Sequence, residues 1–315
     1  MNALRTKPST LESYQTPDYL TAGDTVIIVA PAGILKGRKQ AIENAQKLLK
    51  NWGLAPVLGA HVFSHYHHFA GDDTQRKSDM QWALDHPTAK AIWCARGGYG
   101  SVRILDYLNF ENFKKNPKWL IGYSDITALH NKLQGIGFES IHGMMAVNMK
   151  EDRKSISNSL KTLKLSLFGQ LKSYQINAHK SNRKGTAEGV LIGGNLTLLA
   201  SQLGSASQLN THGKVLFIEE IGEYKYHIDR MLQSLKRAGY FEQCAAVIIG
   251  DMTKIKPNTT DWGSSIEQLI LDVLEPYDFP IAFGIPAGHE LENHSLIFGR
   301  KISLNITTNG TQICF

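Results

Sequence analysis

Short apolar segments alternate with amphipathic segments along the first half of the chain, and this alternation constrains the fold more than any other feature. Apolar runs of strand length occupy residues 25–30, 55–58, 89–94 and 117–121. Segments with helical spacing follow them at residues 38–52, 73–84, 101–107 and 127–133. This order predicts an α/β fold whose N-terminal domain is a doubly wound, flavodoxin-like parallel sheet. Functional groups of such a sheet gather beyond the carboxyl ends of its strands.

The composition turns polar at residues 151–183, where Lys, Ser and Asn are dense. We interpret this stretch as the connection between an N-terminal domain (1–165) and a C-terminal domain (185–315), with residues 166–184 as the linker. Strand-like runs dominate the second half, at residues 189–195, 215–220, 245–250, 280–284, 301–306 and 311–315. This pattern predicts a smaller, β-rich α/β domain, with an active site in the cleft between the two domains.

The composition excludes several classes of function. The chain has 315 residues, 42% of them hydrophobic and 20% charged, which is typical of a soluble globular protein. No apolar run approaches the roughly 20 residues that span a bilayer, and residues 1–21 have no secretory pattern, so we expect a cytoplasmic protein with no membrane partner. The net charge is +6, but the lysines and arginines are scattered along the chain without forming a basic tract, which argues against nucleic acid as a partner. We leave a homodimer open.

The clearest sign of chemistry is Ser124, which follows the apolar run 117–121 and precedes a helical segment. A serine on such a strand-to-helix turn points outward, and the nearby helix N-terminus favours a developing negative charge. Ile126 replaces the second glycine of the usual nucleophile motif G-x-S-x-G, which argues against an ordinary α/β-hydrolase esterase. The alternative is that Ser124 only caps the helix.

A nucleophilic serine needs a base, and His289 is the best candidate among twelve histidines. It lies just after an apolar run, on a loop shaped by glycine and proline, where a side chain can be held in one pose. The alternative is a loop histidine that only bonds its neighbours. The cluster of histidines at 61, 65, 67 and 68 lacks a metal-ligand spacing, so we expect a surface loop there and no metal.

Two adjacent carboxylates, Glu219 and Glu220, end another apolar run. Because side chains alternate along a strand, only one of the two can face Ser124 and orient the base. The alternatives are that both are solvated, or that one pairs with Lys225 or Arg230.

With these residues in place, the chain resembles the LD-carboxypeptidases, serine peptidases that remove D-alanine from murein tetrapeptides, a family that includes microcin C self-immunity proteins. The resemblance runs from residue 23 to residue 315 and is carried by segments 23–26, 30–33, 76–79, 92–100, 121–127, 193–196, 217–220, 228–230 and 284–289. Two positions and one segment depart from the family: Glu220 stands where Asp is frequent, Met144 stands where proline is usual, and residues 290–298 are atypical.

The resemblance implies a catalytic triad of Ser124 as nucleophile, His289 as general base and acid, and Glu219 as the acid that orients His289. It also implies an oxyanion hole built from the backbone N–H groups of Gly98 and Asp125, and a reaction that needs no cofactor or metal. The free carboxylate of the substrate needs a donor group, for which Arg96, Arg103 and the backbone N–H groups of residues 97–100 are candidates. The alternative for Arg96 is a structural ion pair. Asn195 is a further candidate for substrate binding.

The implied reaction is hydrolysis of the L,D-amide bond before the terminal D-alanine of a murein tetrapeptide, in peptidoglycan recycling. A small peptide is then the expected partner. The first alternative is a self-immunity peptidase that cleaves aminoacyl-nucleotide antibiotics with the same triad. The second is a ligand-binding α/β module without catalysis, which predicts that Ser124 does not react covalently.

Overall fold

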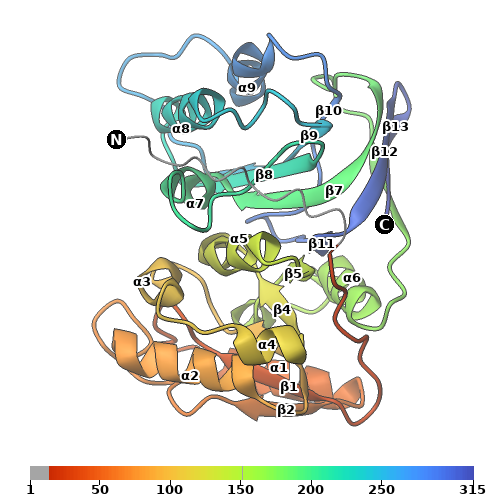
Figure 1. Cartoon of the computed structure of the whole chain (residues 1–315). Coiled ribbons are helices and arrows are strands. Elements are labelled where there is room, and N and C mark those ends of the chain that lie inside the picture. The colour runs from red at the N-terminus through yellow and green to blue at the C-terminus, as the bar shows by residue number, and fades with distance from the viewer. Residues whose placement is uncertain (1–13, 151) are drawn as a thin grey trace, which may run out of the picture.

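The computed structural model describes residues 14–150 and 152–315, and within them the strands form two sheets (Figure 1). Residues 1–13 and 151 lie outside the described part of the chain, so the expectations that include them are not assessed there. The N-terminal half of the chain builds one sheet with its helices, and the C-terminal half builds most of the other. The predicted α/β class is confirmed.

The first sheet has the strand order β11-β5-β4-β3-β1-β2. Five of its strands run parallel, namely β1 (Thr25–Val29), β2 (Ala55–Leu58), β3 (Ala89–Cys94), β4 (Trp119–Gly122) and β5 (Ser140–His142). The order 2-1-3-4-5 is the flavodoxin-like order that the alternation predicted. The sixth strand, β11 (Leu296–Phe298), comes from the far end of the chain and pairs antiparallel with β5.

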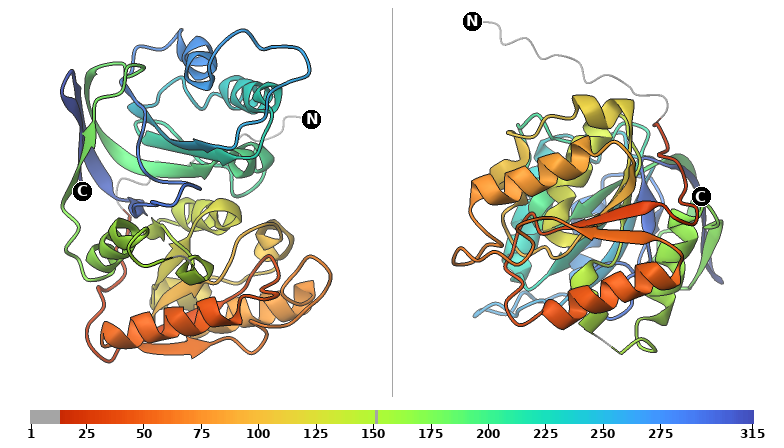
Figure 2. Two further views of the ribbon diagram at one scale, coloured as in Figure 1. Left: turned by 180° about the vertical axis from the view of Figure 1, so that it is seen from behind. Right: turned by 90° about the horizontal axis from the view of Figure 1, so that it is seen from below.

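Helices cover both faces of this sheet. α1 (Lys39–Asn51) lies on one face and α2 (Asp73–Asp85) on the other, as the view from below shows (Figure 2). α2 begins with a capping box between Asp72 and Gln75, which satisfies two free N–H groups of its first turn. The remaining helical segments of this half are α3 (Ser101–Leu105), α4 (Glu111–Lys115), η1 (Ser124–Ile126), α5 (Thr127–Gly135) and η2 (Ala146–Lys150).

The second sheet has the order β10-β9-β8-β7-β12-β13-β6. Its strands are β6 (Ser173–Asn177), β7 (Gly185–Asn195), β8 (Val215–Ile221), β9 (Ala246–Thr253), β10 (Ile281–Ala282), β12 (Lys301–Thr307) and β13 (Gly310–Cys314). Strands β7 to β10 run parallel, whereas β12, β13 and β6 are added antiparallel. α6 (Ser157–Leu167) lies beside the first sheet, next to β5 (Figure 1), and the helices of the second half are α7 (Leu196–Ser201), α8 (Lys225–Arg237) and α9 (Ile266–Leu274).

Two strands cross the boundaries that the sequence suggested. β6 lies inside the expected linker of residues 166–184 and forms an edge of the second sheet. β11 belongs by sequence to the C-terminal half but completes the first sheet. One hydrophobic core accordingly reaches both sheets, and the rings of Phe217 on β8 and Phe298 on β11 lie 6.1 Å apart within it. The two halves are therefore packed against each other rather than tethered by a linker alone.

A second apolar core lies between the second sheet and its outer helices, with Leu232 of α8 and Ile270 of α9 among its buried residues. In the described part of the chain, no helix has the length and apolar character needed to cross a membrane. Cys94 and Cys244 are buried free thiols and Cys314 is a partly buried one. Burial raises the pKa of the Cys94 and Cys244 thiols, so both are held in the neutral form.

Candidate active site

Ser124 lies on a tight turn directly after β4. Its backbone has φ = 62°, in the left-handed region that non-glycine residues seldom adopt. A Cβ atom on Gly122 would lie 2.8 Å from Cγ1 of Ile126, so the turn closes tightly only because residue 122 is glycine. The chain then enters η1 and continues into α5. The sequence predicted a strand-to-helix turn at this position, and the strained backbone is typical of a turn that displays a nucleophile.

The glycine-rich loop after β3 passes against this turn. A Cβ atom on Gly97 would lie 3.3 Å from Cβ of Ser124 and 3.4 Å from the backbone nitrogen of Asp125. Gly98 has φ = 98°, a conformation that glycine adopts without strain. The carbonyl of Gly97 accepts a hydrogen bond from the backbone N–H of Gly33, 3.0 Å away, which fixes the loop from its other side. The two expected oxyanion donors, Gly98 and Asp125, are therefore on adjoining segments.

The side chain of Asp125 also joins these segments. Its Oδ2 atom accepts a hydrogen bond of 2.8 Å from the backbone N–H of Ser101, at the start of α3. The carboxyl is buried, and burial raises its pKa above the usual range. Because Asp125 directly follows Ser124, this hydrogen bond ties the end of the glycine-rich loop to the serine turn.

His289 and Glu219 form a hydrogen-bonded pair. The Nδ1 atom of His289 lies 2.7 Å from Oε2 of Glu219, whose side chain is completely buried, while 12% of the His289 side chain remains exposed. Burial opposes protonation of the imidazole, but the carboxylate of Glu219, together with the charges of Glu220 and Asp251, outweighs burial and raises the pKa of His289 above its usual value. In this pair Nδ1 of His289 is bound to the carboxylate, which leaves the other ring nitrogen, Nε2, available for a different partner.

Tyr123 connects the pair to the serine turn. Its ring, in the residue next to Ser124, lies 4.9 Å from the His289 ring. Within residues 14–150 and 152–315, no hydrogen bond joins Ser124 to His289. A nucleophile and its base are commonly further apart in the absence of substrate than during the reaction. The structure therefore places the turn of Ser124, which follows β4 of the first sheet, against the pair formed by Glu219 on β8 and His289 on the loop after β10 of the second sheet.

Glu220 has a different environment from Glu219. Its carboxylate accepts hydrogen bonds from Nδ2 of Asn195 at 3.1 Å, from the backbone N–H of Thr197 at 2.8 Å and from the backbone N–H of Ile221 at 2.7 Å. Burial raises its pKa. Strand alternation placed the two glutamates on opposite faces, and the structure agrees: one binds His289 and the other holds the start of α7. Arg230, considered as a partner of a glutamate, lies over the Tyr226 ring.

The three expected substrate-binding residues differ in how far their polar groups are already occupied. Asn195 is buried, with Nδ2 bound to Glu220 and Oδ1 capping α7 by accepting from the N–H of Leu198. Arg103 forms a two-pronged ion pair with Asp73, with N···O distances of 2.6 to 3.0 Å. Arg96 donates to the carbonyl of Ile34 and has no acidic partner among the described residues.

One acidic residue near His289 was not singled out from the sequence. Asp251, at the end of β9, accepts a hydrogen bond of 3.1 Å from the backbone N–H of Glu290. Burial, together with Glu290 and Glu219, raises its pKa to about 6. The signal was present in the sequence, because Asp251 follows the apolar run 245–250 just as Glu219 follows 215–218.

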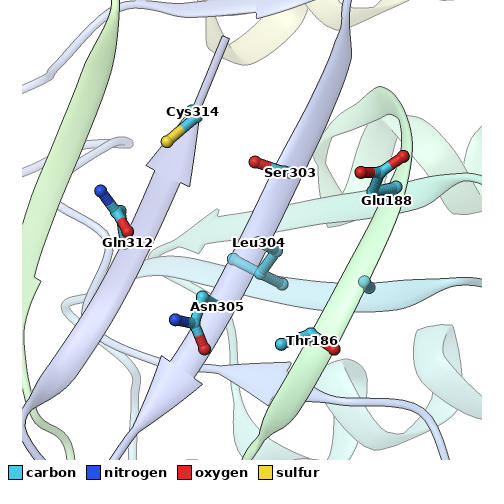
Figure 3. Close-up of a pocket in the computed structure, with 8 residues that line it drawn as sticks. Thr186, Glu188, Ser303, Leu304, Asn305, Gln312 and Cys314 are labelled. Atoms are coloured by element: carbon cyan, nitrogen blue, oxygen red, sulfur yellow. The ribbon is translucent and has the colours of Figure 1, made fainter.

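Other features lie away from this candidate site. The shallow hollow shown in Figure 3 is lined by side chains of β7, β12 and β13 and includes none of the expected site residues. In the histidine-rich loop, His61 pairs with Asp79 at 2.7 Å. Within the described residues, no three His, Cys, Asp or Glu side chains form a group that could hold a metal ion.

Comparison with known proteins identifies the family. The sequence model of the LD-carboxypeptidase N-terminal domain matches residues 26–143, and that of the LD-carboxypeptidase C-terminal domain matches residues 188–304. A probable murein peptide carboxypeptidase of Bacillus subtilis is 33% identical, over 92% of this chain and 91% of that protein. The chain belongs to the LD-carboxypeptidase family. Membership makes it a peptidase of the carboxypeptidase type.

Two solved structures share the fold over nearly the whole length of both chains. The muramoyltetrapeptide carboxypeptidase from Oxalobacter formigenes is 26% identical with a TM-score of 0.83, and the match covers 92% of this chain and 98% of that one. The microcin C7 self immunity protein MccF, solved in complex with aspartyl sulfamoyl adenosine, is 20% identical with a TM-score of 0.82, over 96% and 98% of the two chains. At that identity the second likeness concerns the fold alone.

Proposed function

We propose that this protein is a serine carboxypeptidase that hydrolyses the L,D-amide bond before the terminal D-alanine of murein tetrapeptide, in cytoplasmic peptidoglycan recycling. The observation that carries the proposal is the 2.7 Å contact between His289 and the buried Glu219, beside the strained turn of Ser124. The names of the Bacillus subtilis and Oxalobacter formigenes relatives support murein peptide as the substrate.

In the first step, His289 acts as general base toward Ser124. The Nδ1–H of His289 is bound by Glu219, so the free Nε2 is the nitrogen that accepts the proton of the Ser124 hydroxyl. The serine oxygen then attacks the amide carbonyl before D-alanine. The negative charge of Glu219 stabilises the imidazolium that forms, which agrees in direction with the raised pKa of His289.

The oxyanion of the tetrahedral intermediate is assigned to the backbone N–H groups of Gly98 and Asp125. The close approach of the glycine-rich loop to the Ser124 turn supports this assignment, because donors on both segments can then converge on one oxygen. Removing one donor of this kind typically costs a factor of about 10² to 10³ in kcat.

The free carboxylate of the terminal D-alanine is assigned to Arg96. Arg103 is already neutralised by its ion pair with Asp73, and Asn195 is buried and occupied, whereas the guanidinium of Arg96 has no acidic partner among the described residues. The guanidinium can bind a carboxylate through two parallel hydrogen bonds.

His289 completes the cycle. It donates its proton to the leaving nitrogen of D-alanine, and the tripeptide stays attached to Ser124 as an ester. A water molecule then enters, His289 removes its proton, and the water oxygen attacks the ester carbonyl; as the ester bond breaks, His289 returns the proton to the Ser124 oxygen and the tripeptide leaves as a free acid. The residues assigned here supply every proton transfer in both steps.

The experiment that tests the substrate presents two compounds in competition. Purified protein is incubated with equal amounts of murein tetrapeptide and an aminoacyl sulfamoyl adenosine, and products are identified by mass spectrometry. The proposal predicts loss of one D-alanine from the tetrapeptide while the nucleotide is consumed slowly or not at all. Preferential cleavage of the nucleotide would favour the self-immunity activity. Failure of both compounds to react, with no covalent labelling of Ser124 by a fluorophosphonate, would favour a ligand-binding module.

A further inference from the structure

Asp251 holds the segment that carries His289 on both sides. Its backbone N–H donates to the carbonyl of Ala287, 2.9 Å away, and its side-chain Oδ2 accepts from the N–H of Glu290 at 3.1 Å. These two bonds bracket His289, since Ala287 lies two residues before it and Glu290 one residue after. One residue of β9 therefore fixes the backbone from which the imidazole projects.

Gly288 shows how closely this segment packs on the acids. Its φ is +142°, and a Cβ atom placed on it would lie 2.8 Å from Cβ of Asp251 and 3.2 Å from Oε2 of Glu219. The backbone of Gly288 therefore lies against both carboxylate side chains. Its own N–H donates to Oδ1 of Asn293 at 3.3 Å, which anchors the loop further along the chain.

We propose that Asp251 is a positioning residue for His289, which fixes the imidazole through the segment 287–290 and acts as a second negative charge behind Glu219. Glu219 binds the ring itself, whereas Asp251 holds the backbone on which the ring is mounted. The inference rests on the proposed function only in giving His289 a proton-transfer role.

The charged groups around this centre come from several elements. Around His289 they are Glu219 and Glu220 on β8, Asp251 on β9 and His142 on β5; Asp251 additionally faces Glu290. His142 is fully buried, and burial keeps its pKa well below 6.5, so it contributes no positive charge near neutral pH. The net field at His289 is thus negative and favours the imidazolium.

The sign of the expected effect follows from this field. Asp251 is among the acids that raise the pKa of His289, so removing its charge should lower that pKa. The base form of His289 would then persist to lower pH, while the imidazolium formed during acylation would lose part of its stabilisation. The acid limb of kcat/KM should move to lower pH and kcat should fall.

Asp251→Asn is the decisive variant, because an amide oxygen can still accept the bond from the Glu290 N–H while the charge is gone. We expect the titration midpoint of His289, followed by NMR of histidine-labelled protein and assigned with His289→Gln, to move down by about 0.5 pH units or more. In steady-state assays on murein tetrapeptide, kcat should fall about 3- to 10-fold with KM nearly unchanged.

Two further variants test whether the effect is specific to Asp251 and how much of it comes from the hydrogen bond to Glu290. Asp261→Asn removes a carboxylate from the exposed loop after β9 and should leave both the His289 midpoint and kcat unchanged. Asp251→Ala also removes the bond to Glu290 and should lower kcat more than Asp251→Asn does.

An unchanged His289 midpoint in Asp251→Asn overturns the proposal, whatever the activity. So does an equal shift in Asp261→Asn. If the wild-type protein does not cleave murein tetrapeptide and the midpoint still shifts, the positioning role stands and the proposed function fails.

Discussion

The backbone N–H of Asn195 donates a 3.0 Å hydrogen bond to Oγ1 of Thr127. Thr127 begins α5, three residues after Ser124, and Asn195 ends β7, where it is paired in register with Glu219 of β8. A Cβ atom on the preceding Gly194 would lie 2.5 Å from the same Thr127 oxygen, so the contact is tight. This bond joins the serine turn of the first sheet to the acid-bearing strand of the second.

Thr127→Val should therefore loosen the site, because it keeps the shape of the side chain but leaves the Asn195 N–H without an acceptor. We expect a loss of about 1 to 3 kcal/mol in unfolding free energy, and a fall in kcat beyond what Thr127→Ser causes. Serine keeps the hydroxyl and is the matched control. Chemical denaturation and steady-state kinetics measure the two effects, and equal behaviour of the variants would show that the bond is unimportant.

Substitutions of Glu219 and Glu220 should have different effects, one on catalysis and the other on stability. Glu219→Gln should lower kcat steeply with little change in KM, because an amide cannot stabilise the imidazolium of His289 and can hold the ring in the wrong tautomer. Glu220→Gln should mainly lower the melting temperature, since Glu220 holds Asn195 and the first turn of α7. An inactive Glu220→Gln beside an active Glu219→Gln would contradict the assignment.

Arg96 and Arg103 should differ in their effect on substrate binding. Arg96→Gln should raise KM for a peptide that ends in a free carboxylate, and the defect should largely disappear with the corresponding peptide amide. Arg103→Gln should change KM little, because its guanidinium is already paired with Asp73. A selective defect in Arg103→Gln would instead assign the carboxylate to that residue.

The stability of the protein should fall in acid, partly because of His130. Burial lowers the pKa of this histidine from 6.5 to about 4. As the pH falls below 6.5, His130 becomes protonated in the unfolded chain but stays neutral in the folded protein down to about pH 4. The free energy of unfolding therefore decreases across that pH interval. At pH 5 the cost is about 2 kcal/mol relative to pH 7.

His130→Gln should remove that share of the pH dependence. Urea unfolding at pH 7 and pH 5 should show a smaller difference in free energy for His130→Gln than for the wild type, even if the variant is less stable at both. His212→Gln, at an exposed position, is the control and should keep the wild-type difference. A wild-type difference in His130→Gln would mean that His130 is protonated in the folded protein at pH 5.

Much of the first sheet was predictable because parallel strands buried on both faces leave continuous apolar runs, as residues 26–30 and 91–94 do. β11 could not be predicted, because it is only three residues long and its partner strand β5 lies more than 150 residues earlier in the chain, so no local sequence pattern marks it. β6 was missed for a related reason: its side chains alternate between buried and exposed at a sheet edge within a polar stretch.

At the site, the sequence indicated which residues would meet but not what each would bind. Strand alternation separated Glu219 from Glu220 correctly, since it depends only on the period of a strand. That Arg103 would be occupied by Asp73 could not be foreseen, because the two residues come from different helices whose packing decides the pair. Asp251 could have been found by applying to β9 the reasoning used for β8.

The most direct test of the account is the release of D-alanine from murein tetrapeptide by the wild type, Ser124→Ala, His289→Ala and the double variant. The account predicts release by the wild type, almost none by either single variant at unchanged melting temperature, and a double variant scarcely worse than either, because the two residues act as a unit. Release by Ser124→Ala at the wild-type rate, or losses that add in the double variant, would contradict it.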